Sequence, residues 1–213
     1  MHRPRTLVFG GTGRIGPPIL QFLQRRMDVT LFSRRRDYPL PPPHRTLQCD
    51  LRDVQSTAGA VEASLAADCD RRESPLGVLY MATDGLGAGE ATRADAEFGI
   101  SAIGLDAVVR AIARHSPSPE RVAVVFTSSQ AVETFPSAGV GYEIGKAAGE
   151  QYCRHMAHNP PAEGWRFNVI RIGRVAVAPE LVNAVAHLTD FLLGDTSRGI
   201  SGQVFTASSP WSA

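Results

Sequence analysis

Cysteine is scarce in this chain, and the three that occur form no recognised metal site or redox motif. Cys49, Cys69 and Cys153 are odd in number and lack CxxC or metal-ligand spacing. Such cysteines are typical of free thiols in a reducing compartment, so we expect a cytoplasmic protein without a disulfide framework. The six histidines also form no metal-binding pattern with Asp, Glu or Cys, and no metal is expected.

Long apolar runs and an excess of charge are also missing. No stretch reaches the roughly 18 to 20 apolar residues of a membrane-spanning helix, and the early run TLVF is far shorter than a signal-peptide core. The 213 residues carry a formal net charge of +1, with a pI near 7.8. This balance gives no electrostatic reason to expect nucleic acid or an anionic membrane as a partner. We therefore expect a soluble protein that acts on a small molecule.

What the sequence does contain is an alternation of β-branched apolar runs with helical segments. The runs predict seven strands at residues 6–10, 28–33, 46–50, 77–82, 121–127, 166–172 and 203–207. Between two of them, residues 98–112 place apolar side chains at helical spacing. This alternation favours a three-layer α/β fold, in which a parallel sheet is covered by helices on both faces. Because no repeat or long linker divides the chain, we expect a single domain over residues 1–213.

The segment FGGTGRIG joins the first expected strand to the first expected helix and is rich in glycine. Gly11, Gly13 and Gly16 fit the pattern GxGxxG, and Gly10 with the last two fits GxxGxxG. Between a strand and a helix, this pattern is typical of a dinucleotide-binding loop, because glycine lets the backbone approach a pyrophosphate at the helix N-terminus. A tight turn without a ligand is the alternative. The predicted cofactor loop comprises Gly10, Gly11, Thr12, Gly13, Arg14, Ile15 and Gly16.

The charge after the second strand indicates which dinucleotide is bound. About 20 residues after the glycines, where an NAD site places Asp or Glu, this chain reads Ser33, Arg34, Arg35 and Arg36. Arginine can pair with the 2′-phosphate of NADP(H), whereas a carboxylate would repel it. Arg14 in the loop could approach the same phosphate. NADP(H) is therefore the predicted cofactor, and an exposed basic run without a ligand remains the alternative for one or two of these arginines.

Tyr142 and Lys146 are four residues apart in GYEIGKAAGE, so a helix would place both on one face. A nearby cation stabilises a phenolate and lowers the tyrosine pKa toward neutral pH, where acid-base catalysis is most effective. Ser129 lies at the end of a predicted strand, where its hydroxyl could polarise the same substrate oxygen. Ser128 competes for that role. Taken alone, the tyrosine and lysine could equally lie on a solvated helix face.

Taken in order, these features resemble the short-chain dehydrogenase/reductase family over nearly the full length. The matching elements are the glycine loop, DLRD at 50–53, the TSS serines, YEIGK, and the strand FNVIRIG. The resemblance implies a doubly wound, Rossmann-like sheet with strand order 3-2-1-4-5-6-7. It also implies that Tyr142 donates or accepts the proton, that Ser129 polarises the carbonyl, and that Lys146 binds the ribose and lowers the tyrosine pKa. The other cofactor contacts that it implies are Asp50, Leu51, Ala82, Ile172 and Gly173.

The chain departs from the family pattern at three places. YMATDG replaces the usual NNAG after the fourth strand, and Ser101 occupies the position of a relay asparagine that holds a water behind the lysine. In addition, only RVAVAP separates Gly173 from the last helical pattern, which leaves almost no room for a lid. A missing lid favours an open site for bulky or carrier-tethered substrates. A second segment, residues 84–96, could cover the nicotinamide instead.

Three functions are therefore compatible with the sequence. The first is an NADP(H)-dependent oxidoreductase of the ketoreductase type, acting on a ketone or secondary alcohol. The second keeps Ser129, Tyr142 and Lys146 but catalyses dehydration, cyclisation or epimerisation without net redox change. The third is a non-catalytic NADP(H) sensor. The resemblance also implies a homodimer or homotetramer, in which the small residues Gly145, Ala148 and Gly149 would allow close helix approach; they could equally accommodate the chain near the cofactor.

Overall fold

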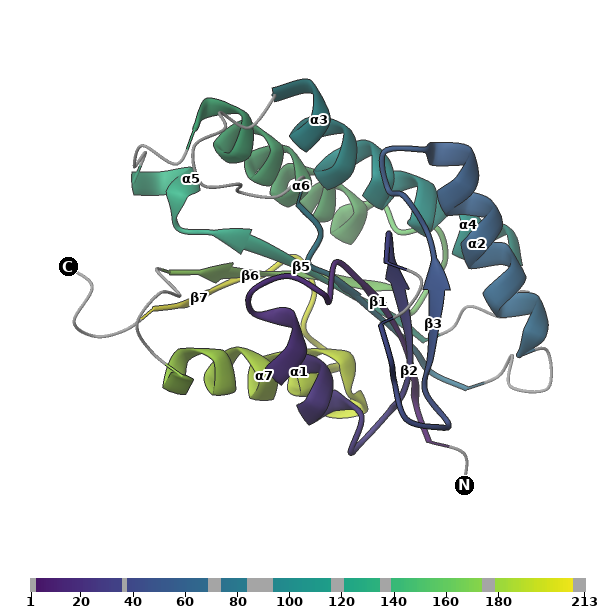
Figure 1. Cartoon of the computed structure of the whole chain (residues 1–213). Coiled ribbons are helices and arrows are strands. Elements are labelled where there is room, and N and C mark those ends of the chain that lie inside the picture. Colours follow the sequence, from purple (N-terminus) through teal and green to yellow (C-terminus); the bar gives the residue numbers. More distant parts are fainter. Residues whose placement is uncertain are drawn as a thin grey trace.

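Seven parallel strands form the centre of the structure, which is a computed structural model (Figure 1). It describes residues 3–35, 38–68, 74–83, 94–115, 121–134, 139–173 and 179–208. The strands follow the order β3-β2-β1-β4-β5-β6-β7. This confirms the doubly wound parallel sheet and the strand order that the sequence predicts. The strands are β1 (Arg5–Phe9), β2 (Asp28–Ser33), β3 (Arg45–Gln48), β4 (Leu76–Tyr80), β5 (Val122–Ser129), β6 (Arg166–Ile172) and β7 (Val204–Ala207).

Helices cover both faces of the sheet (Figure 1). One face carries α1 and α7, which contact each other, and the opposite face carries α2, α4 and α6. Every residue of β1, β4 and β6 is buried, as expected for parallel strands that are covered by helices on both faces. The helices are α1 (Gly16–Leu23), α2 (Val54–Ala67), α3 (Ala94–Phe98), α4 (Leu105–His115), α5 (Ala131–Thr134), α6 (Val140–His158) and α7 (Pro179–Leu193).

Local sequence signals account for where several helices begin. Asp53 caps α2, because its side chain accepts hydrogen bonds from the backbone N–H groups of Gln55 and Ser56. Pro17 and Pro18 lie in the first turn of α1, where a missing N–H costs little. An aspartate at the N-cap and a proline in the first turn are both common sequence signals of a helix start. Among the described residues, no helix combines the length and apolar character needed to cross a bilayer.

A row of aromatic side chains crosses the sheet on the face covered by α4 and α6. Phe32, Phe9, Tyr80 and Phe126 occupy paired positions on β2, β1, β4 and β5. Neighbouring ring centroids along this row are 4.5, 5.5 and 6.2 Å apart. Such cross-strand stacking adds about 0.5–1.5 kcal/mol for each pair beyond the burial of area. The row lies at or near the carboxyl ends of the strands, so it forms a rigid base under the residues that follow.

The helix between β4 and β5 is longer and less regular than expected. The sequence predicts one helix over 98–112, but the structure has α3, a π-helix η2 (Gly99–Gly104) and α4 in direct succession. Tyr80 on β4 donates its hydroxyl to the Ile100 carbonyl at 2.6 Å, inside this π-helix. The irregular segment is therefore fastened to the sheet by a side chain from a distant strand. Single-turn π segments of this kind are frequent at functional sites.

Candidate active site

The glycine loop lies between β1 and α1, at the carboxyl end of the sheet. Gly10 has a φ of +80°, and a Cβ placed there would lie 2.5 Å from the Ala82 backbone. Gly16 leaves no room for a Cβ against the Gly11 carbonyl, so both positions require glycine for packing. Gly13 differs, because it is exposed and the nearest atom to an added Cβ would be 3.6 Å away. The fold itself does not demand glycine at this point, which leaves a bare stretch of backbone for a pyrophosphate to approach.

The remaining loop residues have different environments. Thr12 is half-buried, Arg14 is exposed, and Ile15 packs against the core between the sheet and α1. The loop therefore presents a basic side chain to solvent while an apolar one anchors it.

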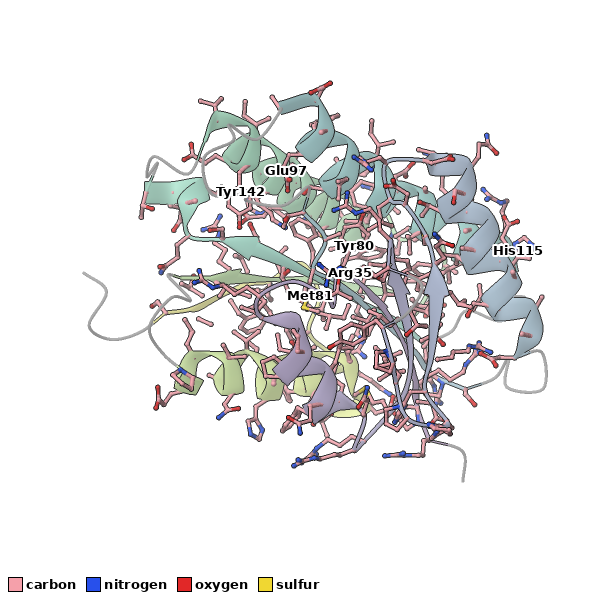
Figure 2. The ribbon with its side chains drawn as sticks, viewed as in Figure 1. Arg35, Tyr80, Met81, Glu97, His115 and Tyr142 are labelled. Carbon is pink, nitrogen blue, oxygen red and sulfur yellow. The ribbon has the colours of Figure 1, made fainter. Side chains whose placement is uncertain are left out.

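The basic residues after β2 lie where the ribose of a dinucleotide would be bound on this topology. Ser33 is buried, and its Oγ accepts a hydrogen bond of 3.0 Å from the Arg35 N–H. Arg34 and Arg35 are exposed, and Figure 2 labels Arg35. Ser33 thus fixes the turn that carries both arginines. Arg36 lies outside the described residues.

Asp50, predicted to contact the adenine, is bound by a residue that sequence reasoning missed. Arg52 donates to Asp50 through Nε and Nη2, at 3.1 and 2.7 Å, and its backbone N–H adds a third bond of 3.1 Å. These bonds, with weaker help from the Arg34 charge, lower the pKa of Asp50. The neighbouring Leu51 is buried. The spacing DxR in the segment DLRD was the available signal for this pair.

Ser129 and Tyr142 come together from the end of β5 and the first turn of α6. A hydrogen bond from Ser129 acts on the Tyr142 phenol, and Ser129 Oγ also accepts from the Ala131 N–H at 3.2 Å. Ser128 is also buried, but its Oγ has no hydrogen-bond partner within the described part of the chain. Consecutive strand residues point to opposite faces. The geometry therefore favours Ser129 over Ser128 as the serine that accompanies Tyr142.

Lys146 lies about one helical turn after Tyr142 on α6 and is 2% exposed. Its Nζ donates to the carbonyl oxygens of Ala82 and Thr127, both at 3.1 Å. The same atom is 5.0 Å from the centroid of the Phe126 ring and 5.8 Å from that of Tyr142. Burial lowers the pKa of Lys146 to about 8. Lys146 is also the only lysine among the 22 lysine and arginine residues of the chain.

No family model and no curated protein matches the chain. Solved structures do match over nearly its full length. A short-chain type dehydrogenase/reductase from Mycobacterium ulcerans is 22% identical, with a TM-score of 0.77, and the match covers 97% of this chain and 89% of that one.

Two further matches are similar in extent. A short-chain dehydrogenase from Burkholderia cenocepacia in complex with NADP is 21% identical, with a TM-score of 0.77 and 97% of each chain covered. A short-chain dehydrogenase/reductase family oxidoreductase from Brucella ovis, in complex with a partially ordered NAD, is 20% identical, with a TM-score of 0.76 and 96% and 99% covered. The chain has the short-chain dehydrogenase/reductase fold.

On this fold, the pKa of Tyr142 differs from the sequence prediction. We expected Lys146 to lower it, but in this structure the pKa is raised, because burial outweighs the opposing hydrogen bond from Ser129. The Lys146 ammonium meanwhile directs its hydrogen bonds to two backbone carbonyl groups. The phenol is therefore held in its protonated form at neutral pH.

The end of β6 borders the same edge of the short-chain dehydrogenase/reductase fold. Ile172 is buried, and its carbonyl accepts from the Gln130 N–H at 3.1 Å. Gly173 donates its N–H to the Ala207 carbonyl at 2.8 Å, and a Cβ at Gly173 would lie 2.7 Å from Gln130 Oε1. These contacts join β5, β6 and β7 at the place where the predicted nicotinamide contacts lie.

A buried ion pair beneath Ile172 was not predicted. Arg171 on β6 donates from Nε and Nη2 to the two carboxylate oxygens of Glu150 on α6, each at 2.7 Å, and also pairs with Glu133 on α5. Glu150 is one helical turn beyond Lys146, so the pair holds the same face of α6 against the sheet. Arg171 among the apolar residues at the end of the expected strand was the signal that sequence reasoning did not use.

The region behind Lys146 also holds a buried acid that the sequence reading missed. Ser101 lies in the π-helix, and its Oγ donates to Glu97 Oε1 at 3.2 Å. Glu97 and Ser101 are both fully buried. A Cβ at Gly104 would lie 2.7 Å from the Tyr80 hydroxyl oxygen and 3.0 Å from the Leu51 carbonyl oxygen, so this glycine lets the helix approach the sheet. The position assigned to a relay asparagine is thus filled by a serine that is hydrogen-bonded to the buried carboxyl group of Glu97.

Gly145 and Gly149 are buried, and a Cβ added at either would meet Glu97 or Phe126, which favours the second of the two expectations for these glycines. They accommodate the chain's own side chains.

Helix α7 begins at Pro179, so only residues 174–178 follow Gly173 before it, in agreement with the predicted short connection. Most of the alternative covering segment, residues 84–93, lies outside the described residues.

Proposed function

We propose that this protein is an NADP(H)-dependent oxidoreductase of the ketoreductase type, which interconverts a ketone and a secondary alcohol. The observation that carries the proposal is the cluster of Ser129, Tyr142 and a fully buried Lys146 at the carboxyl ends of β4 and β5. A helix that only presented a solvated face would not bury its lysine. An ammonium group in such a place is expensive unless it is used, because burial disfavours the charged form.

The roles of the three side chains follow from their hydrogen-bonding capacity. A phenol that is protonated at neutral pH donates a proton to a carbonyl oxygen as negative charge develops there. Ser129 can donate to the same oxygen and fix its position. The Lys146 charge stabilises the phenolate left behind. When bound, the nicotinamide supplies the hydride to the carbonyl carbon. Because the pKa of Tyr142 is raised, the phenol carries at neutral pH the proton that ketone reduction requires.

The residues present fit NADP(H) better than NAD(H). Gly13 leaves its backbone accessible, and Arg34 and Arg35 are exposed beside it at the end of the neighbouring strand. The only acid predicted nearby, Asp50, is already held by Arg52, so its charge is largely offset. The matched structures include one complex with NADP and one with NAD. The preference therefore depends on these arginines rather than on the fold.

The substrate is proposed to be bulky, rigid or carrier-tethered. On this fold, a covering segment after β6 would be the natural enclosure of a small substrate, but residues 174–178 are too few to form one. A ketone that brings its own apolar bulk needs less enclosure by the protein.

Calorimetric titration with NADPH and with NADH tests the cofactor assignment. We expect tighter binding of NADPH, and replacement of Arg34 and Arg35 by alanine should weaken NADPH binding by about 10- to 100-fold while leaving NADH nearly unchanged. Arg154→Ala, an exposed arginine about three helical turns from Tyr142 on α6, is the control. Equal affinities for the two cofactors would refute the preference.

Turnover is tested with a panel of ketones of increasing size, followed by nicotinamide absorbance. Tyr142→Phe should lower kcat by at least about 100-fold and spare NADPH binding. Substrate conversion without any change in nicotinamide absorbance would instead identify the non-redox alternative. Binding of NADPH with no conversion of any substrate class would identify the sensor.

We also infer a homo-oligomer formed through an apolar surface on α3, η2 and α6. Phe98, Ile103, Val140 and Ile144 are 42%, 46%, 69% and 48% exposed, and the helices that carry them contact one another. Ile144→Glu should dissociate the oligomer in sedimentation velocity, whereas Phe191→Glu on α7 should not. A monomer in the unsubstituted protein would contradict the inference.

The free thiols of Cys49 and Cys153 favour a reducing, cytoplasmic location.

A further inference from the structure

Glu97 is an ionisable side chain in a place where glutamate is rarely found. It lies on α3 and is 0% exposed, although Glu is among the residues least often fully buried. Its Oε1 accepts the hydrogen bond of 3.2 Å from Ser101 Oγ in the π-helix. Figure 2 shows Glu97 beside Tyr142, on the neighbouring helices α3 and α6. The carboxyl group therefore lies behind the proposed catalytic pair rather than at the surface.

The packing of α6 is adapted to this side chain. A Cβ at Gly145 would lie 2.6 Å from Glu97 Cγ and 2.9 Å from its carbonyl carbon. Any residue other than glycine would therefore displace Glu97 or separate the two helices. Gly145 directly precedes Lys146, so this close contact between α3 and α6 lies within one helical turn of the lysine. Glycine at position 145 is therefore what allows the buried side chain of Glu97 to pack against α6.

The charge of Glu97 acts on the groups around it. On α6 these groups are Lys146 and Tyr142, and on β4 the group is Tyr80; the carboxylate raises the pKa of all three. On the π-helix the facing group is the Ser101 hydroxyl, which does not titrate. Lys146 donates its two hydrogen bonds to neutral carbonyl groups. Glu97 is thus the negative charge that opposes the effect of burial on Lys146.

We propose that Glu97 is a positioning residue of this site, a buried counter-ion that keeps Lys146 charged at neutral pH. It acts through Lys146 and does not touch the substrate. In place of the asparagine and water of the family pattern, the chain uses a fixed carboxylate held by Ser101. The role in turnover rests on the proposed oxidoreductase function, whereas the effect on Lys146 does not.

The single lysine makes a direct measurement simple. Protein that carries lysine labelled with ¹³C at Cε gives one side-chain NMR resonance, whose titration reports the pKa of Lys146 without substrate or cofactor. We expect Glu97→Gln, which keeps the shape and removes the charge, to lower that pKa by at least about one pH unit. Asp95→Asn removes an exposed charge from the same helix and should leave it unchanged. Ser101→Ala should change it only slightly.

An unchanged pKa of Lys146 in Glu97→Gln, or an equal fall in Asp95→Asn, would overturn the proposal. If Glu97→Gln does not fold, the unsubstituted protein still decides the matter, because a Lys146 amine that is neutral at pH 7 would also overturn it. A second readout is the pH dependence of kcat/KM for ketone reduction, whose alkaline limb should move to lower pH in Glu97→Gln. Absence of turnover in both proteins would refute the proposed function and leave the NMR result standing.

Discussion

Replacing Arg171 with methionine tests whether the buried ion pair holds α6 on the sheet. Arg171 binds both carboxylate oxygens of Glu150 at 2.7 Å, and the two residues are 9% and 3% exposed. Methionine keeps the apolar stem but leaves the Glu150 carboxylate buried without this partner. Removal of one member of such a pair costs about 3–5 kcal/mol. For a chain of this length, that loss corresponds to a fall in Tm of about 6–20 °C.

Urea denaturation followed by far-UV circular dichroism gives the free energy of unfolding of four proteins. These are the unsubstituted chain, Arg171→Met, Glu150→Met and the double variant. We expect the double variant to lose less than the sum of the single losses, because two apolar side chains can pack where two charges were. Arg198→Met is the control, since Arg198 pairs with Asp195 on the surface and should contribute less than about 1 kcal/mol.

The reasoning would be refuted by either of two results. One is a loss below about 1 kcal/mol for Arg171→Met, which would mean that water satisfies the remaining Glu150 carboxylate. The other is strict additivity of the two single losses, which would mean that Arg171 and Glu150 contribute to the free energy of unfolding independently of each other.

Three further outcomes can be measured on the same preparations. Gly59→Ala should raise the free energy of unfolding by about 0.5–1 kcal/mol, because an added Cβ meets nothing within 4 Å in the middle of α2. Gly149→Ala should lower it by about 1–3 kcal/mol, because the Cβ would overlap the Phe126 ring; equal effects of the two substitutions would contradict the packing. Cys49 and Cys153 have pKa values raised by burial, so mass spectrometry should find both unmodified by iodoacetamide in the folded protein and modified in urea.

The layers and strands of the fold were readable from the sequence because they depend on local patterns. β2 and β6 have the predicted bounds, and the other strands differ from prediction by one or two residues. Parallel strands covered on both faces are mostly apolar, and the turns that follow them often carry glycine or a capping residue such as Asp53. Both requirements produce sequence patterns that lie within a few residues of the strand or helix concerned.

The parts of the site that could not be predicted depend on contacts between distant segments. The π-helix is fastened by the Tyr80 hydroxyl, which comes from β4, and nothing in GISAIG itself distinguishes it from an ordinary helix. Glu97 reads as one more acid on a solvated helix face until α6 is placed against it. The direction of the Tyr142 pKa also required the degree of burial, which spacing along the chain does not give.

The burial of Lys146 has a practical consequence for amine chemistry. Since the chain has no other lysine, its folded surface offers acylating reagents no side-chain amine, and the amino terminus alone should react. Any modification of Lys146 then requires α6 to part from the sheet. The slow rate at which an activated ester labels Lys146 would therefore report how often α6 opens from the sheet by local unfolding.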